Sequence, residues 1–404
     1  MTSTTINVQS WPETLNGIGT ELMQRGEERL SRLATIMADL TRKNTPLRLP
    51  RELIRSNENL NSRQTAALVA EFETMLTAWP EATKTLLAFA SDFPERSLDL
   101  FELATAINPC FTPSTIPLYL QGIHARRIDE TVAAVDRACT RSHADIVSLL
   151  HTTPISRLAE VYLDREARRG EPAIFLTTMP KSGSMYLVKT IQHTTGLCIL
   201  STCIASNMAR DHLVPSWARA FSQGGAVCQE HMHASEENID GLRAAGIQRV
   251  VVHVRDPRQA LLSAIHHLQS REAELRSLFG SSVLPPPTVR TFSQRTQWML
   301  EHHLPELIDW ISGWLAVERD PDQPIDILFT QYDQLTTNKR NLFDMIFSFY
   351  GITPKEHLYP EKNAAVHFRR GDPHEWRSVF SHHQIMTMNQ QIPRQIMERF
   401  GWAP

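Results

Sequence analysis

Hydrophobic residues recur at two different spacings along the chain, and the change between them divides it near residue 165. Before this point they recur every three or four positions, as on one face of a helix, for example at Leu68, Phe72 and Trp79. After it, helical stretches alternate with short, mostly apolar runs, which lie at 173–176, 226–228, 250–254 and 325–329 and are interrupted only by His253 and Asp326. Continuous apolar runs separated by helices predict buried parallel strands with helical crossovers.

The two spacings predict a two-part α/β chain. We expect residues 1–165 to form an all-helical N-terminal region and residues 166–404 to form a three-layer domain with a central parallel sheet and a phosphate-binding loop. The charged segment from Arg165 to Pro172, which contains the breaker Gly170, marks the boundary. We expect the helical region to act as a lid, as a contact between copies in a homo-oligomer, or as packing support.

The turn after the first apolar run carries the residues with the clearest chemistry. Pro180 ends the strand, and Lys181-Ser182-Gly183-Ser184 then supplies a cation, two hydroxyls and a residue free to adopt a positive φ. Helical spacing resumes directly afterwards, so the first-turn N–H groups point outward with the positive end of the dipole behind them. This pattern predicts an anion site, although an ordinary turn with a solvated lysine has the same pattern.

Composition narrows the range of functions. The 404 residues are 42% hydrophobic and 21% charged with a net charge of −3, which is ordinary for a soluble protein and gives no global attraction to nucleic acid. The five cysteines form no CxxC pair, which disfavours a disulfide framework and a zinc knuckle. The start lacks the features of a signal peptide, and no apolar stretch is long enough to span a membrane, so we expect a cytoplasmic protein.

Chemically useful side chains follow the other predicted strands, at the edge where ligands bind in parallel sheets. Arg255 ends the run 250–254, and Ser263 lies about two turns into the next helix, so both can hold one phosphate. His231 and His233 follow the run 226–228. Either histidine can act as a general base, and the pair also has a two-ligand metal spacing without an obvious third ligand.

Two further segments complete the set of candidates. Tyr332 follows the run 325–329, where it can contact a base or a hydroxyl, or pack at the edge of the core. Arg369, Arg370 and Gly371 form a basic loop, and its glycine permits a close backbone approach to a second anion. The candidates together describe a ligand with two separated anionic ends and an aromatic base between them.

In this order, the segments resemble the sulfotransferase family that uses 3′-phosphoadenosine-5′-phosphosulfate (PAPS). Pro180-Lys181-Ser182-Gly183-Ser184-Met185-Tyr186 is similar to that family's 5′-phosphosulfate loop, Pro-Lys-Ser-Gly-Thr-Thr-Trp. Arg255 and Ser263, eight positions apart, match its 3′-phosphate arginine and serine. Tyr332-Asp333 resembles its tyrosine–acid segment, and the basic loop with Glu375-Trp376-Arg377 resembles Arg-Lys-Gly followed by Asp-Trp-Lys. The resemblance covers residues 172 to 380.

The resemblance implies in-line transfer of a sulfuryl group from PAPS to a hydroxyl or amine of a small-molecule acceptor, with 3′,5′-bisphosphate (PAP) as product and no metal. Lys181 would stabilise the charge that develops on the leaving oxygens, and His231 would accept the proton of the acceptor. The positions that it assigns to binding of the donor are Lys181, Ser182, Gly183, Ser184, Met185, Tyr186, Arg255, Ser263, Tyr332, Arg369, Arg370 and Gly371.

The chain departs from the family pattern at three positions. Met185 replaces a hydroxyl residue, Tyr186 replaces a tryptophan but keeps an aromatic face for the adenine, and Gln229 stands where cytosolic members carry a lysine. The number of residues from the strand to the family's catalytic histidine selects His231, whereas the number of residues from that histidine to Arg255 selects His233. We expect His231, since the register of a strand varies less than the length of a loop.

Two other function classes fit parts of the pattern. A P-loop nucleotide kinase needs Gly-x-x-x-x-Gly-Lys-Ser/Thr, but here Lys181 precedes the only glycine of the loop. A non-catalytic interaction protein with a vestigial nucleotide site would not need Lys181, His231 and both phosphate clamps together. We therefore expect an enzyme.

Overall fold

The computed structural model describes residues 128–140, 148–149, 152–153, 155–205, 209–279, 284–322, 324–361, 372 and 374–404. The chain forms two compact units, Met1–Tyr162 and Leu163–Pro404. In the first unit the structure describes helix α8 (Ile128–Thr140). Residues 1–127 lie outside the described part, so the all-helical character of the N-terminal region and its limit at residue 165 stay predictions.

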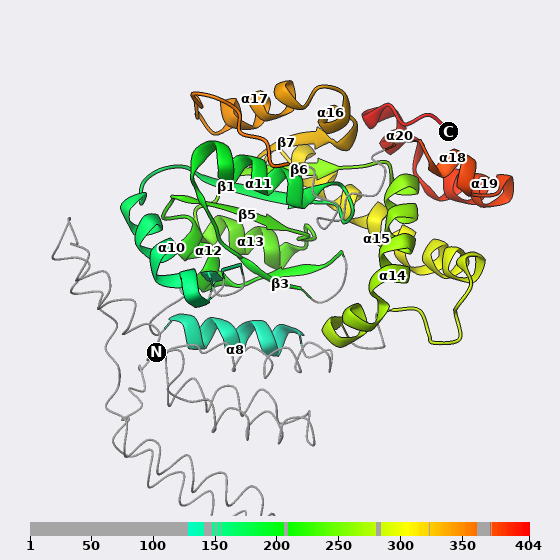
Figure 1. Cartoon of the computed structure of the whole chain (residues 1–404), viewed down its shortest axis with the longest axis horizontal. Helices are drawn as coiled ribbons and strands as arrows, with labels where there is room; N and C mark the ends of the chain where they lie inside the picture. The colour runs from blue at the N-terminus through cyan, green and yellow to red at the C-terminus, as the bar shows by residue number, and fades with distance from the viewer. Residues whose placement is uncertain are drawn as a thin grey trace, which may run out of the picture. The chain divides into compact units, whose positions relative to one another are not determined.

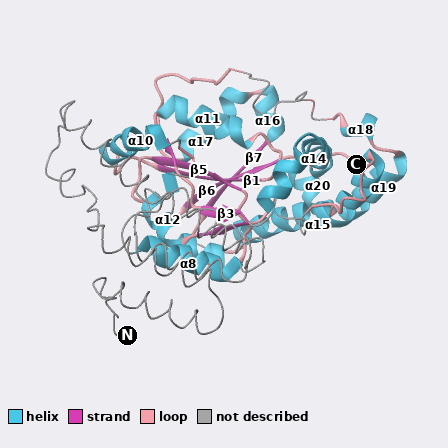
Figure 2. Ribbon diagram, turned by 60° about the horizontal axis from the view of Figure 1, so that its bottom comes forward, coloured by secondary structure: helices cyan, strands magenta, loops and turns pink. Residues whose placement is uncertain are grey.

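A parallel sheet of five strands, in the order β2-β5-β1-β6-β7, forms the centre of the second unit (Figures 1 and 2). Its strands are β1 (Ala173–Thr178), β2 (Cys198–Ile199), β5 (Ala226–Glu230), β6 (Arg249–Val254) and β7 (Asp326–Gln331). A separate antiparallel pair consists of β3 (Cys203–Ala205) and β4 (Asp211–Leu213). The predicted α/β class with a central parallel sheet is confirmed.

Helices connect the strands as a parallel sheet requires. Those described before β7 are α10 (Ile155–Ala167), α11 (Ser184–Thr195), α12 (Pro215–Phe221), α13 (Glu236–Ala244), α14 (Pro257–Phe279) and α15 (Phe292–Arg319). Those after it are α16 (Tyr332–Thr337), α17 (Lys339–Phe349), α18 (Trp376–Val379), α19 (His382–Gln391) and α20 (Arg394–Phe400).

The central strands β1, β5 and β6 are buried on both faces, which explains why they read as apolar runs, whereas the edge strand β7 is mostly half-buried. On one face, α11 and α17 contribute Leu187, Ile191 and Phe343 to a core that also contains Ile174 and Leu176 of β1. On the other face, Phe175 packs edge-on against Phe221 of α12, with ring centroids 5.8 Å apart. The central strand β1 therefore carries a buried helix layer on each side.

A tyrosine joins two neighbouring strands near their amino ends. The Tyr350 hydroxyl accepts a hydrogen bond from the Phe175 N–H at 3.0 Å and donates to the Arg249 carbonyl at 2.8 Å. Burial raises the pKa of Tyr350, so the hydroxyl keeps its proton. This end of the β1–β6 pair is thus fixed by a fully buried side chain.

Candidate active site at the carboxyl edge of the sheet

The phosphate-like loop connects β1 to α11 through two left-handed residues, Lys181 with φ 66° and Gly183 with φ 89°. The Met179 N–H donates to the His253 carbonyl at 2.8 Å, and the Ser182 N–H donates back to the Met179 carbonyl at 3.2 Å. These bonds hold the turn against β6. The amides of Tyr186 and Leu187 donate to the Gly183 carbonyl at 2.9 and 3.2 Å, so the amides that can face a ligand are those of Gly183, Ser184 and Met185.

Gly183 is required at its position for two reasons. Its φ lies in the left-handed region, where a side chain is strained. In addition, an added Cβ would lie 3.1 Å from a methyl carbon of Leu335 and 3.3 Å from the Tyr332 ring. The start of α16 therefore packs directly on the loop, which brings the predicted site residues Gly183 and Tyr332 together.

Lys181 carries a charge in a site that disfavours it. Burial, followed by the positive charges of Arg255 and Arg271, lowers the pKa of Lys181 to about 8. Its amine thus remains largely protonated at neutral pH, in surroundings with excess positive charge and little water. A bound anion would relieve this repulsion directly.

The hydroxyl of Ser182 supports the interpretation of this loop as an anion site. Its side chain is fully buried, and its Oγ has no hydrogen-bond partner among the described residues. A buried hydroxyl without a partner is costly, and a phosphate oxygen at the loop would accept from it. The chemistry of this atom fits the 5′ end of the donor that the sequence implies.

The next three positions begin helix α11. Ser184 starts the helix and is partly exposed. Met185, which stands where a hydroxyl residue was expected, points outward with 39% of its surface exposed. Tyr186 is partly buried against the core below α11. The Met185 side chain therefore faces solvent and is not part of the buried core.

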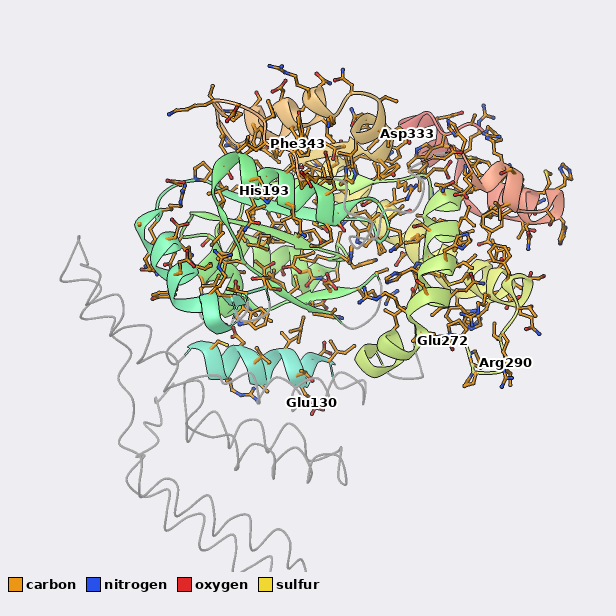
Figure 3. The ribbon with its side chains drawn as sticks, viewed as in Figure 1. Glu130, His193, Glu272, Arg290, Asp333 and Phe343 are labelled. Carbon is orange, nitrogen blue, oxygen red and sulfur yellow. The ribbon has the colours of Figure 1, made fainter. Side chains whose placement is uncertain are left out.

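Arg255 lies at the end of β6 and reaches the loop. Its Nη1 donates to the Lys181 carbonyl at 2.7 Å, and its guanidinium lies 3.8 Å above the centre of the Tyr332 ring. The structure therefore brings Lys181, Arg255 and Tyr332 to one place, as predicted. Asp333 follows Tyr332 (Figure 3), and burial raises the pKa of its carboxyl. Ser263 lies farther along α14 and is partly exposed.

The predicted basic loop Arg369-Arg370-Gly371 lies outside the described residues. The segment after it is anchored by Trp376, whose side chain is fully buried and whose backbone N–H donates to Gln259 Oε1 at 3.0 Å. Arg258 lies 4.1 Å above this ring while it binds Asp256 through two of its nitrogens, both within 2.9 Å. Helix α14 thus fixes the point at which the chain leaves the basic loop.

His231 follows β5 and is held by the neighbouring strand. Its Nδ1 lies 2.7 Å from the Thr178 carbonyl, and its backbone N–H donates to the Asp211 carboxylate. A carbonyl oxygen only accepts, so Nδ1 carries the proton and Nε2 keeps its lone pair. His231 is partly exposed. The contact with Thr178 therefore fixes the tautomer and the direction of the ring.

His233 has a different set of neighbours. Its Nε2 lies 2.9 Å from the Asp309 carboxylate on α15, which also lies 3.8 Å from Arg210. A carboxylate only accepts, so Nε2 of His233 carries a proton and Nδ1 is the nitrogen left to accept one. The two alternative histidines thus have different partners: a backbone carbonyl binds His231, and a carboxylate binds His233.

A pair of buried carboxyl groups supports the segment that carries His231. Glu230 accepts from the Thr202 N–H at 2.5 Å and from its hydroxyl at 3.0 Å. Burial, with the nearby charge of Asp211, raises the pKa of Glu230 to about 8. Burial also raises the pKa of Asp211, against the opposing effect of His231. Glu230 therefore holds a proton at neutral pH.

Sequence reasoning missed two residues that position the site. His253 lies inside the apolar run of β6, and Thr178 lies at the end of β1, beyond the apolar run predicted as a strand. The Gln229 amide donates to the Thr178 hydroxyl at 3.0 Å, so Gln229 and His231 are both held by Thr178. A histidine between valines at a strand end was the only signal that pointed to His253.

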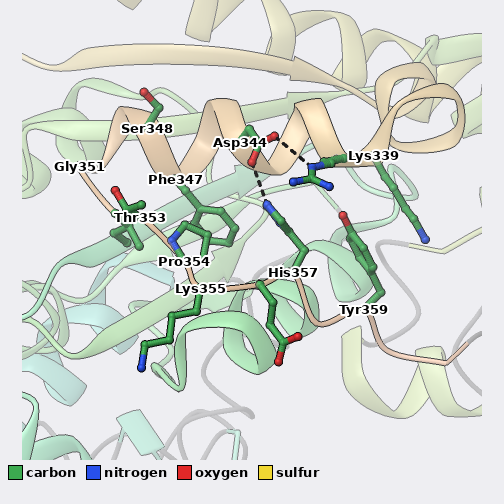
Figure 4. Close-up of a pocket in the computed structure, with 13 residues that line it drawn as sticks. Lys339, Asp344, Phe347, Ser348, Gly351, Thr353, Pro354, Lys355, His357 and Tyr359 are labelled. Carbon is green, nitrogen blue, oxygen red and sulfur yellow. Dashed lines mark hydrogen bonds and ion pairs between the residues drawn. The ribbon is translucent and has the colours of Figure 1, made fainter.

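A cavity of about 730 Å³ lies elsewhere in this unit, between α17 and the segment Gly351–Tyr359 (Figure 4). Its charged and aromatic groups pair with one another. His357 Nε2 lies 2.8 Å from Asp344, and the Lys339 amine lies 4.1 Å above the Tyr359 ring. None of the predicted site residues lines it.

The described residues contain no cluster of histidine, cysteine, aspartate and glutamate suited to a metal ion. Across the same ranges, no helix combines the length and the apolar character that crossing a membrane requires.

Comparison with known proteins assigns the family. The model of the sulfotransferase domain matches residues 171–401, more than half of the chain. The protein belongs to the sulfotransferase domain family. Among solved structures, this sulfotransferase domain is similar to mouse sulfotransferase SULT7A1 complexed with PAP, with 14% identity and a TM-score of 0.41 over 60% of this chain and 88% of that chain. No curated protein matches the sequence significantly.

Proposed function

We propose that the protein transfers the sulfuryl group of PAPS to a hydroxyl or amine of a small-molecule acceptor. The observation that carries this proposal is the loop at the end of β1, where Lys181 and the Ser182 hydroxyl, which has no partner among the described residues, lie beside the start of α11. The donor supplies a sulfuryl group, whose bond to the 5′-phosphate breaks as its bond to the acceptor oxygen or nitrogen forms. Catalysis then depends mainly on position and charge.

Lys181 is proposed to stabilise the negative charge that develops on the leaving phosphate. Its pKa of about 8 leaves it cationic at neutral pH, and burial strengthens its field, because little water screens it. The Ser182 hydroxyl, Ser184 and the amides of Gly183 and Met185 would hold the oxygens of the 5′-phosphate. The group of donors is fixed before the ligand arrives, which is what electrostatic stabilisation requires.

His231 is proposed to accept the proton of the acceptor at Nε2. The bond from Nδ1–H to the Thr178 carbonyl supports this role, because it fixes both the tautomer and the direction of the ring. At His233 the Asp309 carboxylate binds Nε2, which would leave Nδ1 to accept a proton, so the preference for His231 rests on its contact with Thr178 at the end of the central strand β1.

The 3′-phosphate is proposed to bind Arg255, Ser263, Arg369 and Arg370, with Gly371 permitting close approach of the backbone. Tyr332 supports this assignment, because its ring holds the Arg255 guanidinium in place. The partly exposed Tyr186 would offer its ring to the adenine. Positive side chains supply the charge that a metal supplies in kinases, so the mechanism we propose uses no metal. A cytoplasmic location stays a prediction.

Calorimetry on the full chain tests the donor. Adenosine 3′,5′-bisphosphate should bind, adenosine 5′-phosphate should bind at least tenfold more weakly because it lacks the 3′-phosphate, and ATP with Mg²⁺ should not bind. Preferential binding of ATP would instead indicate a kinase. Transfer from labelled PAPS to a panel of phenols, alcohols and amines then tests catalysis. Tight bisphosphate binding without transfer to any acceptor would favour a non-catalytic protein.

A further inference from the structure

His253 contacts the phosphate-like loop through both its backbone and its side chain. It lies at the carboxyl end of β6, in register with Thr178 of β1 on one side and Thr330 of β7 on the other. Its carbonyl accepts from the Met179 N–H at 2.8 Å, and its Nε2 lies 3.0 Å from the Ser182 carbonyl. The two contacts bracket Lys181, the residue in the left-handed conformation.

The hydrogen bonds of the ring define its protonation state. The Ser182 carbonyl only accepts, so Nε2 of His253 must carry the proton. The other nitrogen, Nδ1, lies 2.8 Å from the Thr330 hydroxyl, which therefore donates to it. Burial lowers the pKa of His253 to about 3, consistent with a neutral ring. Thr330, His253 and Ser182 thus form a directed chain from hydroxyl to imidazole to carbonyl.

This chain determines which way a peptide group of the loop faces. The peptide bond between Ser182 and Gly183 is planar and trans, so its N–H points away from its carbonyl. Because the carbonyl is bound by His253, the Gly183 N–H faces the opposite side, toward the amides of Ser184 and Met185 that begin α11. Without the imidazole donor, the Ser182 carbonyl would be buried without this partner, and rotation of the peptide would withdraw the Gly183 amide from the anion site.

We propose that His253 and Thr330 are positioning residues that hold the loop in its anion-binding conformation before the donor binds. His253 is fully buried, and Ser182 lies between it and the ligand face of the loop, so it acts through the loop and not on the donor. This inference rests on the proposed function for its effect on PAPS, but the ordering of the loop is a property of the free protein.

The test compares His253→Leu with Tyr350→Phe in the full chain. Both remove buried hydrogen bonds that link β1 or its loop to neighbouring elements, but Tyr350 acts at the amino end of the strands. In His253→Leu, hydrogen exchange of the segment 179–187 in the free protein should accelerate, and the affinity for adenosine 3′,5′-bisphosphate should fall about tenfold. Tyr350→Phe should lower the melting temperature without either effect.

Two further variants keep the test decisive. His253→Gln retains an amide donor for the Ser182 carbonyl and should restore slow exchange and affinity. Thr330→Val keeps the shape of the side chain while it removes the donor to Nδ1. It should accelerate exchange and weaken affinity to a smaller extent than His253→Leu. If His253→Leu does not fold, Thr330→Val tests the positioning role in its place. If exchange of 179–187 is unchanged in both His253→Leu and Thr330→Val, or rises equally in Tyr350→Phe, the positioning role is wrong. If exchange behaves as expected but even the wild type fails to bind the bisphosphate, the proposed function fails and the positioning role stands.

Discussion

The two ends of the β1–β6 strand pair differ in whether their buried polar groups have partners. At the amino end, the Tyr350 hydroxyl makes hydrogen bonds to both strands, with no charge involved. At the carboxyl end, a lysine in the left-handed conformation has a lowered pKa, and a buried serine hydroxyl lacks a partner among the described residues. Buried polar groups that have hydrogen-bond partners stabilise a fold. A buried charge or hydroxyl that lacks a partner is instead stabilised when a ligand binds to it.

The comparison predicts that substitutions at the carboxyl end change activity while those at the amino end change stability. Strain at the carboxyl end persists because surrounding residues impose it. The Lys181 carbonyl is bound by Arg255, and the Ser182 carbonyl is bound by His253. The predictions below test this division, beginning with the largest effect.

His231→Ala should reduce sulfuryl transfer by about 100- to 10,000-fold, because a general base contributes that much. Binding of adenosine 3′,5′-bisphosphate should be unchanged, since His231 is proposed to act on the acceptor. Steady-state transfer and calorimetry on the same preparation measure the two effects. His233→Ala is the matched control and should keep its activity. Loss of transfer in His233→Ala with retention in His231→Ala would exchange the two assignments.

Lys181→Ala should reduce transfer by about 100- to 1,000-fold, as when one preorganised donor to a developing charge is removed. Its melting temperature should stay level or rise, because the variant removes a buried cation from beside Arg255. Differential scanning calorimetry alongside the transfer assay measures both. A clear fall in melting temperature would show that Lys181 stabilises the fold, and the contrast between the two ends of the strands would be lost.

The apolar pattern predicted the central strands because they are buried on both faces, but it predicted their ends less well. β1, β5 and β7 continue into polar residues, to Thr178, Glu230 and Gln331. The strands β2, β3 and β4 are two or three residues long, too short to have a recognisable period. Their pairing depends on tertiary contacts that a local pattern does not contain.

Residues that follow a strand could be singled out from the sequence, whereas residues that support them from a neighbouring segment could not. Lys181, Arg255 and Tyr332 were predicted from positions after strands, and the structure brings them together. His253 and the Asp309 partner of His233 were missed, because each depends on a contact between distant segments. The hydrogen-bond partners of His231 and His233 likewise could not be inferred from the spacing in the sequence.

Tyr350→Phe should lower the free energy of unfolding by about 1–3 kcal/mol, because it leaves the Phe175 N–H and the Arg249 carbonyl without their buried partner. Bisphosphate affinity and transfer should be unchanged at temperatures where the variant is folded. Urea unfolding and the transfer assay measure these quantities. A loss of activity in the folded variant would show that the amino end also controls the site.

The smallest expected effect concerns Glu230, whose carboxyl lies directly before His231 but faces the interior. Its pKa is raised to about 8 in the folded protein, so the fold retains a proton that the unfolded chain releases above its ordinary value of 4.5. The free energy of unfolding should therefore decline as the pH rises from about 5 to 8.

Glu230→Gln removes this titration and keeps an oxygen that accepts from Thr202. As the pH rises from about 5 to 8, the melting temperature of Glu230→Gln should increase relative to that of the wild type. Glu236→Gln, at an exposed position in α13, should show no such trend, and a pH-independent difference for Glu230→Gln would exclude the buried proton.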